Sequence, residues 1–403
     1  MAAGNSLFMV IAFAFATLSQ IPGSFVFAEL TSAYPEDGGH YVYFREAGFK
    51  ILTFIIGWLT FLALDGVAVS LMSLAIVNYL GSLLPGVNNL VLRIIAMCIV
   101  IGFALMHVRS VKVGATIQAL ITFIKIIPFV VIIGIGVFFI DPSLFLSTQA
   151  LADASGSAIE SNAFLALVSA ISLSVFSCDG IFAGCYISGE IKNPKRTLPL
   201  GLILATLIVM VLYVALSSTA SGLMTVDEIA YSTAPIADMA AKLPVIGSFA
   251  GPLIAGIAVL VIMGTISSCL LYMPRFEFAM ARDGLFFPIF SKVHSKYKTP
   301  HRAITLFAVY VCVLVMFSDL GNLLGSLSII ILLKNALTYF SIFLLRRKKD
   351  YHPTYKSPGN WIMPVLAFGI TGLLFFFAVF TASAFQLIFN GAILVVGVVA
   401  YFI

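Results

Sequence analysis

Long apolar runs dominate this sequence of 403 residues and constrain its fold more than any other feature. Several runs exceed the roughly 18 to 20 residues that a helix needs to cross a hydrocarbon core about 30 Å thick. Only 10% of the residues are charged, whereas about a quarter of the residues in a soluble domain are charged. Segments 209–216 and 393–403 are apolar on every face, which excludes the strict alternation of a β-barrel strand. The sequence therefore predicts an all-α integral membrane protein.

Polar breaks divide these runs into about eleven expected transmembrane helices, all within a single membrane domain over residues 1–403. The expected helices cover residues 7–28, 51–80, 88–108, 113–140, 163–189, 199–223, 247–274, 303–318, 321–345, 362–383 and 386–403.

The charges of the connecting loops alternate from one side of the membrane to the other. Most of the 22 Lys and Arg residues fall in loops on one side, including 192–196, 275–302 and 346–356. The positive-inside rule makes this side cytoplasmic, and it places the C-terminus in the cytoplasm and residue 1 outside. We expect a multi-pass protein of the plasma or inner membrane. The opposite loops carry only Lys242 against six acidic residues, which are Asp141, Asp153, Glu160, Asp227, Glu228 and Asp238.

Other functional classes find little support in the composition. The basic residues follow the topology, so no nucleic-acid partner is indicated. The five histidines are scattered, and the five cysteines lack CxxC spacing, so neither an enzyme, a metal site nor a cofactor is expected. The cysteines are Cys98, Cys178, Cys185, Cys269 and Cys312.

Three segments resemble motifs of the amino acid-polyamine-organocation (APC) permease superfamily. Residues 27–43 read FAELTSAYPEDGGHYVY, similar to the signature after that family's second helix. Residues 189–199 read GEIKNPKRTLP, similar to the exit of its sixth helix, and residues 280–288 read MARDGLFFP, similar to the element after its eighth helix. The resemblance covers essentially the whole chain. The unwound motif of the family's first helix has no counterpart here.

This resemblance implies a fold of inverted five-helix repeats, LeuT-like, with the first helix absent. The first repeat would span residues 7–140 as family helices 2–5, and the second would span 163–345 as family helices 6–10. Residues 362–403 would form two C-terminal helices. An odd helix count with an external N-terminus is unusual, and one additional inward-starting helix would restore a twelve-helix plan.

A break in the sixth family helix is the expected substrate site. A broken helix persists in a membrane only where it lines a protein-enclosed or wet cavity, because each unpaired backbone group costs several kcal/mol in lipid. Free carbonyls there would accept from a substrate ammonium group, and the following half-helix would face a carboxylate. By family analogy Phe176 would be an aromatic gate, although core packing is an open alternative. The predicted substrate-binding residues are Phe176, Ser177, Cys178, Asp179, Gly180, Asp65 and Ser267.

Charged residues within the apolar runs are the other functional candidates. Lys125 lies in the run 113–140, and a lysine at the bilayer centre costs about 2.5–3.5 kcal/mol. It matches a fifth-helix lysine of many family members, which implies coupling by protonation or exchange; structural pairing with Asp65 or Asp179 is the alternative. Asp65 and Asp179 could neutralise Lys125, attract a cationic substrate or shuttle protons. Lys334 could bond with Asn335 or Asp319, or sit in a water-filled vestibule.

These observations predict a secondary active transporter that moves amino acids by alternating access, either proton-coupled or by exchange. Its expected partners are a small-molecule substrate, protons and the lipid bilayer. One alternative is a polyamine or basic amino-acid transporter, which the intramembrane carboxylates keep open. A second alternative is a truncated, non-transporting membrane protein.

Overall fold

The structure of the chain, a computed structural model, describes residues 6–109, 122, 126–145, 163–232, 235–243, 250–317 and 320–402. Within these ranges the protein is helical and has no strand. Nine of the described helices are long and apolar enough to cross a membrane, and two shorter apolar helices cover Ile126–Phe139 and His301–Phe317. The predicted all-α membrane fold is confirmed.

The helices are numbered in chain order. The first half contains α1 (Ser6–Ala33), α2 (His40–Ala47), α3 (Lys50–Leu59), the π-helix η2 (Thr60–Asp65), α4 (Gly66–Leu83), α5 (Asn89–Arg109), η3 (Val137–Phe139) and α7 (Pro142–Phe145). The middle contains α8 (Ala163–Cys178), the 3-10 helix η4 (Asp179–Glu190), α9 (Pro194–Leu223), α10 (Val226–Tyr231) and α11 (Pro235–Ala241). The last part contains α12 (Ala250–Tyr272), α13 (Pro274–Arg282), η6 (Pro288–Ser291), α14 (His301–Phe317), α15 (Leu320–Leu345), α16 (Ile362–Phe380) and α17 (Ala384–Phe402).

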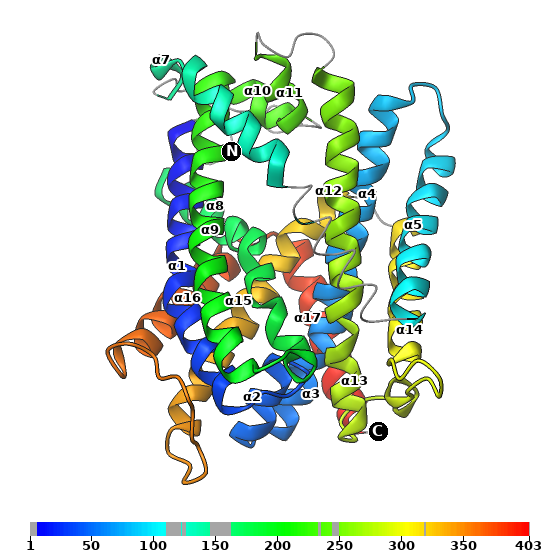
Figure 1. The fold of residues 1–403 in the computed structure, drawn as a ribbon, viewed down its shortest axis with the longest axis vertical. Coiled ribbons are helices and arrows are strands. Elements are labelled where there is room, and N and C mark those ends of the chain that lie inside the picture. The colour runs from blue at the N-terminus through cyan, green and yellow to red at the C-terminus, as the bar shows by residue number, and fades with distance from the viewer. Residues whose placement is uncertain are drawn as a thin grey trace.

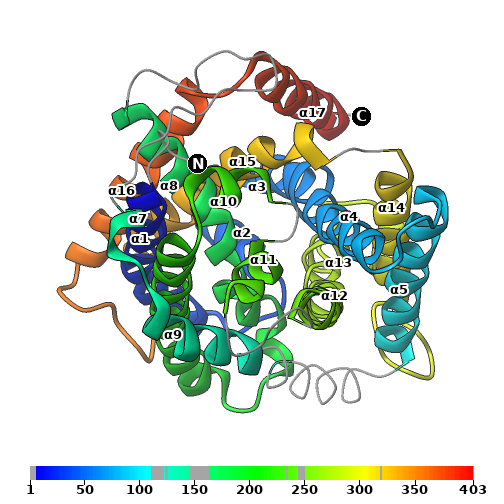
Figure 2. The same cartoon turned by 90° about the horizontal axis from the view of Figure 1, so that it is seen from above.

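The long helices run side by side along the long axis of the molecule (Figure 1). Helix α1 packs against α9, α8 and α16, and on the other side α12 packs against α4, while α5 packs against α14. Seen from above, the helices surround the centre of the bundle, and α17 lies at its periphery (Figure 2). Trp58 of α3 attaches α17 by donating a hydrogen bond of 3.1 Å to the carbonyl of Ile393.

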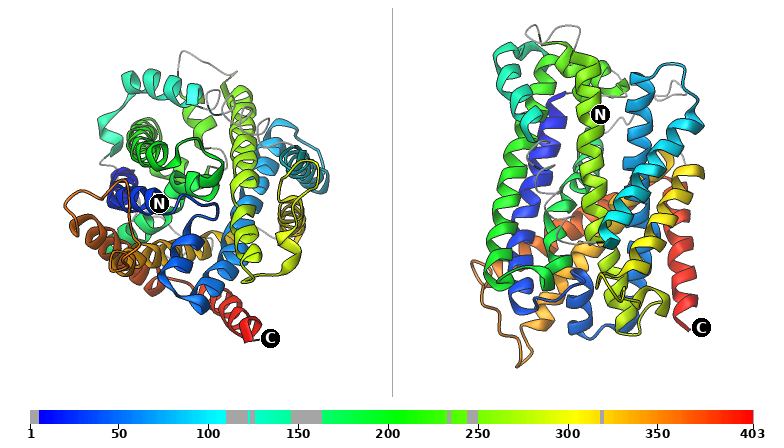
Figure 3. Two further views of the ribbon diagram at one scale, coloured as in Figure 1. Left: turned by 60° about the horizontal axis from the view of Figure 1, so that its bottom comes forward. Right: turned by 45° about the vertical axis from the view of Figure 1, so that its right-hand side comes forward.

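Charge separates the two ends of the bundle. Helices α10 and α11 cover one end and carry Asp227, Glu228 and Asp238, and we call this the acidic end (Figure 1). Helices α2 and α13 lie at the opposite end, close to the C-terminus, and the views of Figure 3 show the same arrangement. Arg45 and Arg282 lie in the last turns of these two helices, and we call this the basic end.

An aromatic cluster joins α1, α2, η4 and α15. The ring of Phe27 stacks on Phe182 with centroids 4.1 Å apart, and it meets His40 at 4.8 Å and Tyr339 at 5.8 Å. All four side chains are fully or almost fully buried. Aromatic pairs in such geometry add about 0.5–1.5 kcal/mol each beyond their buried area. The cluster therefore holds these four elements together around the candidate site.

Two predicted helix boundaries at prolines are wrong. The helix expected to end at residue 274 is followed directly by α13, so that Leu253–Arg282 forms one span. The helix expected to start at residue 199 begins at Pro194. In both cases a proline occupies the first helical position, where its missing N–H group is not needed by the helix. Pro274 thus begins a helical segment instead of ending one.

Candidate functional site

The predicted break in the sixth family helix coincides with a change of helix type. The α-helix α8 ends at Cys178, and Asp179 begins η4, a 3-10 stretch of 12 residues that a kink at Ile187 interrupts. Runs of 3-10 helix longer than three or four residues are uncommon, because their hydrogen-bond geometry is poorer. The residues of the predicted break keep a helical backbone, and a kink with non-helical angles lies further along η4, at Ile187 (φ −117°, ψ 25°). A 3-10 helix keeps most backbone groups bonded, which lipid demands, while it changes the direction of the side chains after residue 178.

Asp179 forms an ion pair with a lysine from a distant helix. Its carboxylate lies 3.3 Å from Nζ of Lys334 on α15, and Asn335 donates to the other carboxylate oxygen at 3.4 Å. The hydroxyl group of Tyr186, on η4, lies 3.3 Å from the same lysine nitrogen. The side chain of Lys334 is 1% exposed, whereas that of Asp179 is 21% exposed. The helix-type change therefore presents an accessible carboxylate backed by a buried cation.

Asp65 adds a second buried carboxyl group to this region. It is the last residue of the π-helix η2, it is 3% exposed, and it interacts electrostatically with both Lys334 and Asp179. Its Oδ2 atom has no hydrogen-bond partner among the described residues. A π-helix changes the backbone hydrogen bonds locally and often marks a functional site. Here Tyr310 supports it by donating to the carbonyl of Leu62 at 2.6 Å.

The remaining predicted residues at the junction have different environments. Phe176 is partly buried against an apolar cluster. The side chain of Cys178 is buried, with its sulfur 3.7 Å from the carbonyl of Ser174. The carbonyl of Ser177 accepts a hydrogen bond of 2.9 Å from Tyr213. A Cβ atom added at Gly180 would have nothing within 4 Å, so the backbone borders open space there.

One predicted substrate-binding residue is not brought to Asp179. Ser267, on α12, is fully buried, and its hydroxyl group lies 3.1 Å from Nε2 of His107 on α5. This bond places Ser267 in the packing between α12 and α5. Lys125, the predicted coupling residue, lies outside the described residues.

His40 closes the site toward the basic end. Its Nδ1 lies 2.7 Å from the hydroxyl oxygen of Thr338, which itself donates to the carbonyl of Lys334 at 2.8 Å. Because Thr338 donates its hydroxyl proton to the carbonyl of Lys334, it can only accept from His40. Nδ1 of His40 therefore carries a proton, and Nε2 is an acceptor. Burial lowers the pKa of His40 well below its usual value, and the charge of Lys334 adds to this effect. His40 is therefore a neutral imidazole beside the ion pair.

Sequence reasoning undervalued Lys334 and did not identify Tyr186 or Glu277. The signal for Lys334 was present, because a lysine within an apolar run is a functional candidate by default. Glu277 was counted with the loop after residue 274, yet it lies in α13 and is 1% exposed. Tyr186 gave no signal that distinguishes it from a packing residue.

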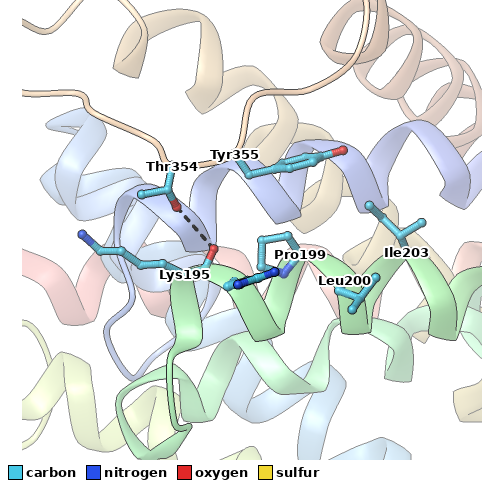
Figure 4. A pocket seen from close by; sticks show the side chains of 7 residues that line it. Lys195, Pro199, Leu200, Ile203, Thr354 and Tyr355 are labelled. Atoms are coloured by element: carbon cyan, nitrogen blue, oxygen red, sulfur yellow. Dashed lines mark hydrogen bonds between the residues drawn. The ribbon is translucent and has the colours of Figure 1, made fainter.

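A separate pocket of about 610 Å³ lies at the basic end of α9 (Figure 4). It is formed by Lys195, Arg196 and three apolar residues of α9, together with Thr354 and Tyr355 of the segment that follows α15. The hydroxyl group of Thr354 donates to the carbonyl of Lys195 at 3.3 Å (Figure 4). None of its lining residues belongs to the Asp179–Lys334 site.

Comparison with known proteins decides the family. The model of the amino acid permease family matches residues 1–401. The chain belongs to the amino acid permease family. The resemblance to APC permeases is thereby confirmed, over nearly the full length of the chain.

Individual relatives agree with this family. The chain is 27% identical to the serine/threonine exchanger SteT of Bacillus subtilis over 90% of this chain and 81% of that protein. It is 26% identical to the branched-chain amino acid permease BcaP of the same organism, over 89% of this chain and 78% of that protein. It is 27% identical to a cadaverine/lysine antiporter of Escherichia coli, over 79% of this chain and 71% of that protein.

The family and the relatives are transporters, so the predicted function of an amino-acid transporter is confirmed. The polyamine and non-transporting alternatives are not favoured. As a multi-pass membrane protein, this permease needs a substrate site within its helical bundle, and the Asp179–Lys334 pair is the candidate for that site.

Proposed function

We propose that this permease binds the zwitterionic head of an amino acid between Asp179 and Lys334. The ammonium group of the substrate would pair with the Asp179 carboxylate, and its carboxylate would pair with the Lys334 ammonium group. The observation that carries this proposal is the ion pair itself, because it presents one charge of each sign within the bundle at a change of helix type. A free amino acid has the complementary pair of charges.

The geometry of the pair supports opening by a substrate. Its N···O distance of 3.3 Å is long for a charged hydrogen bond, which normally measures about 2.7–2.9 Å. A pair with one buried partner gains little net stability, because the desolvation of Lys334 offsets the attraction between the charges. Inserting a zwitterion replaces one long contact by two. The open space beside Gly180 gives the substrate backbone a place to approach.

The transport cycle we propose is alternating access. The first repeat, residues 7–140, contributes Asp65, and the second repeat, residues 163–345, contributes Asp179 and Lys334. Rocking of one repeat against the other would expose the site first at one end of the bundle and then at the other. Lys125 would take part in coupling, as the family resemblance implies.

The orientation we propose places the basic end in the cytoplasm of a cell that carries the protein in its plasma or inner membrane. This follows the positive-inside rule and puts the C-terminus in the cytoplasm. The pocket of Figure 4 fits this orientation, because Lys195 and Arg196 would lie near the anionic headgroups of the cytoplasmic leaflet.

Counterflow of labelled amino acid into proteoliposomes that contain the unlabelled amino acid tests the proposed site. Vesicles loaded with serine, threonine or leucine are expected to take up the same labelled amino acid, because each presents both charged groups. Ethanolamine lacks the carboxylate and lactate lacks the ammonium group, so neither is expected to drive counterflow. Lysine, glutamate and cadaverine complete the panel. Counterflow driven as well by ethanolamine or cadaverine as by serine would contradict a zwitterion site.

A further inference from the structure

Glu277 is a buried acid that the proposed binding of substrate does not use. It lies in α13 and is 1% exposed, and neither of its carboxylate oxygens has a hydrogen-bond partner among the described residues. Asp65 is similar, with 3% exposure and one oxygen without such a partner. An ionised carboxylate buried without a partner is very costly, and such a group takes up a proton instead. Two proton-binding groups therefore lie within the bundle.

The two acids connect the candidate site with the basic end. Asp65 interacts electrostatically with Asp179 and Lys334, and Glu277 interacts electrostatically with Asp65. Glu277 lies one turn before the end of α13, at Arg282, and α13 lies at the basic end (Figure 1). Asp65 is thus linked electrostatically to the proposed substrate pair, and Glu277 lies on α13, the helix at the basic end.

Helix α13, which carries Glu277, packs against α2, α3, η4, η6, α12 and α14. The ring of the preceding residue, Phe276, lies 5.9 Å from the ring of Tyr186 on η4 and 6.2 Å from that of Tyr41 on α2. Because Lys334 already pairs with Asp179, the other buried charged groups described close to the site are two acids, Asp65 and Glu277, and one cation, Arg275. The titratable and charged side chains described on these elements, on η2 and on α15 are His40, Tyr41, Tyr43, Arg45 and Glu46 on α2, Lys50 on α3, Asp65 on η2, Asp179, Cys185 and Tyr186 on η4, Cys269 and Tyr272 on α12, Arg275 and Arg282 on α13, His301, Arg302, Tyr310 and Cys312 on α14, and Lys334 and Tyr339 on α15.

A proton suits this arrangement better than a metal ion. No three His, Cys, Asp or Glu side chains in the described part of the chain are placed to hold a metal ion together. A proton needs only one carboxylate. The excess of buried acid therefore favours groups that each bind one proton.

We propose that Glu277, together with Asp65, carries the proton that drives amino-acid uptake. This inference rests on the proposed site at Asp179 and Lys334. One proton enters with the substrate and binds the Asp65 carboxylate. When water enters between the two acids, the O–H bond at Asp65 breaks and protonates that water, and the hydronium ion then gives its proton to Glu277, where the new O–H bond forms. When the basic end opens, Glu277 releases the proton to water, and both carboxylates are ready for the next cycle. No group is consumed, and one proton moves with each substrate.

The test compares gradient-driven uptake with counterflow in proteoliposomes of the full chain. With an inward proton gradient, wild-type protein is expected to accumulate serine by up to about tenfold for each pH unit, the limit set by one coupled proton. Glu277→Gln keeps the shape of the side chain but cannot titrate. It is expected to lose this accumulation and its pH dependence while it keeps counterflow at constant pH. Glu228→Gln, at the acidic end, is the matched control and is expected to behave as wild type.

Each outcome decides the proposal. Wild-type accumulation that ignores the pH gradient, or accumulation by Glu277→Gln that equals wild type, would overturn it. If Glu277→Gln also loses counterflow, Glu277→Asp, which restores a carboxyl group, must recover gradient-driven uptake; its failure would also overturn the proposal. Absence of amino-acid counterflow in the wild-type protein would instead contradict the proposed substrate site, so the two failures are distinguishable.

Discussion

The guanidinium group of Arg346 lies 2.6 and 2.8 Å from the two carboxylate oxygens of Glu29. The two residues are 317 positions apart in the sequence. Arg346 directly follows α15 and Glu29 belongs to α1, so this bidentate pair joins the end of α15 to α1. Glu29 is 1% exposed and also accepts hydrogen bonds of 2.7 Å from the backbone N–H and the hydroxyl group of Ser357. The pair is a structural connection of the bundle and lies apart from the substrate site.

Replacement of Glu29 by Gln is expected to destabilise the protein by about 3–5 kcal/mol, because it leaves the Arg346 charge buried without its partner. The midpoint temperature of thermal unfolding, recorded on the detergent-solubilised protein, measures this loss. Glu228→Gln is the control, since it breaks an exposed pair with Lys242 that contributes about 0–1 kcal/mol. If Glu29→Gln and Glu228→Gln lose equal stability, the Glu29–Arg346 pair contributes no more than an exposed pair, which would contradict this prediction.

Gly66, the first residue of α4, allows close packing at the end of the π-helix. A Cβ atom there would lie 2.2 Å from the ring of Tyr310, whose hydroxyl group bonds to Leu62. Gly66→Ala is therefore expected to destabilise the protein by about 1–3 kcal/mol through overpacking. Gly102→Ala in α5 would meet nothing within 4 Å, so it is expected to be neutral or to stabilise its helix by up to about 1 kcal/mol. Unfolding midpoints that fall equally would contradict this account.

Acid is expected to loosen the basic end through Asp283. Burial pushes the pKa of Asp283 upward, but hydrogen bonds from Arg45 at 2.7 Å and Tyr41 at 2.8 Å outweigh it, so its pKa lies below the usual 3.8. A lowered folded-state pKa contributes stability at higher pH that is lost as pH falls through it. Asp283→Asn should lower the unfolding midpoint at pH 7 and reduce its further decline below about pH 4. An unchanged pH profile would contradict this role, and Asp227→Asn at the acidic end is the control.

Lys125 lies in the apolar run 113–140, outside the described residues. Lys125→Ala is expected to abolish or uncouple transport and to leave folding largely intact, because a lysine at the bilayer centre costs about 2.5–3.5 kcal/mol and is retained for function. Counterflow and its pH dependence measure the effect, with Lys349→Ala as an exposed control. Wild-type exchange with wild-type pH dependence in Lys125→Ala would refute the prediction.

The membrane-spanning helices follow from the sequence because lipid imposes a simple rule of length and apolarity. The expected helix 321–345 is α15, at Leu320–Leu345, and the expected helix 88–108 is α5, at Asn89–Arg109. The ends are harder to predict, because they depend on local backbone chemistry. The expected helix 247–274 ends where Pro274 starts a further helical segment.

The candidate site is only partly predictable for a different reason. Asp179 and Asp65 were found because a carboxylate in an apolar run needs an explanation. Their partner, Lys334, is 155 residues from Asp179 in the chain, and which helices meet depends on packing that hydropathy does not encode. Ser267 shows the same limit, because its polar side chain meets His107 instead of the substrate site.

Counterflow by variants of the ion pair tests the central claim most directly. Asp179→Asn and Lys334→Met each remove one partner of the zwitterion, which should cost about 2 kcal/mol or more of binding free energy, an affinity loss of at least about 30-fold. Asp227→Asn and Lys349→Met remove a half-buried acid and an exposed lysine away from the site and should leave the half-saturating serine concentration unchanged. If Asp179→Asn and Lys334→Met both fold and exchange serine with wild-type affinity, the amino acid is bound elsewhere in the permease.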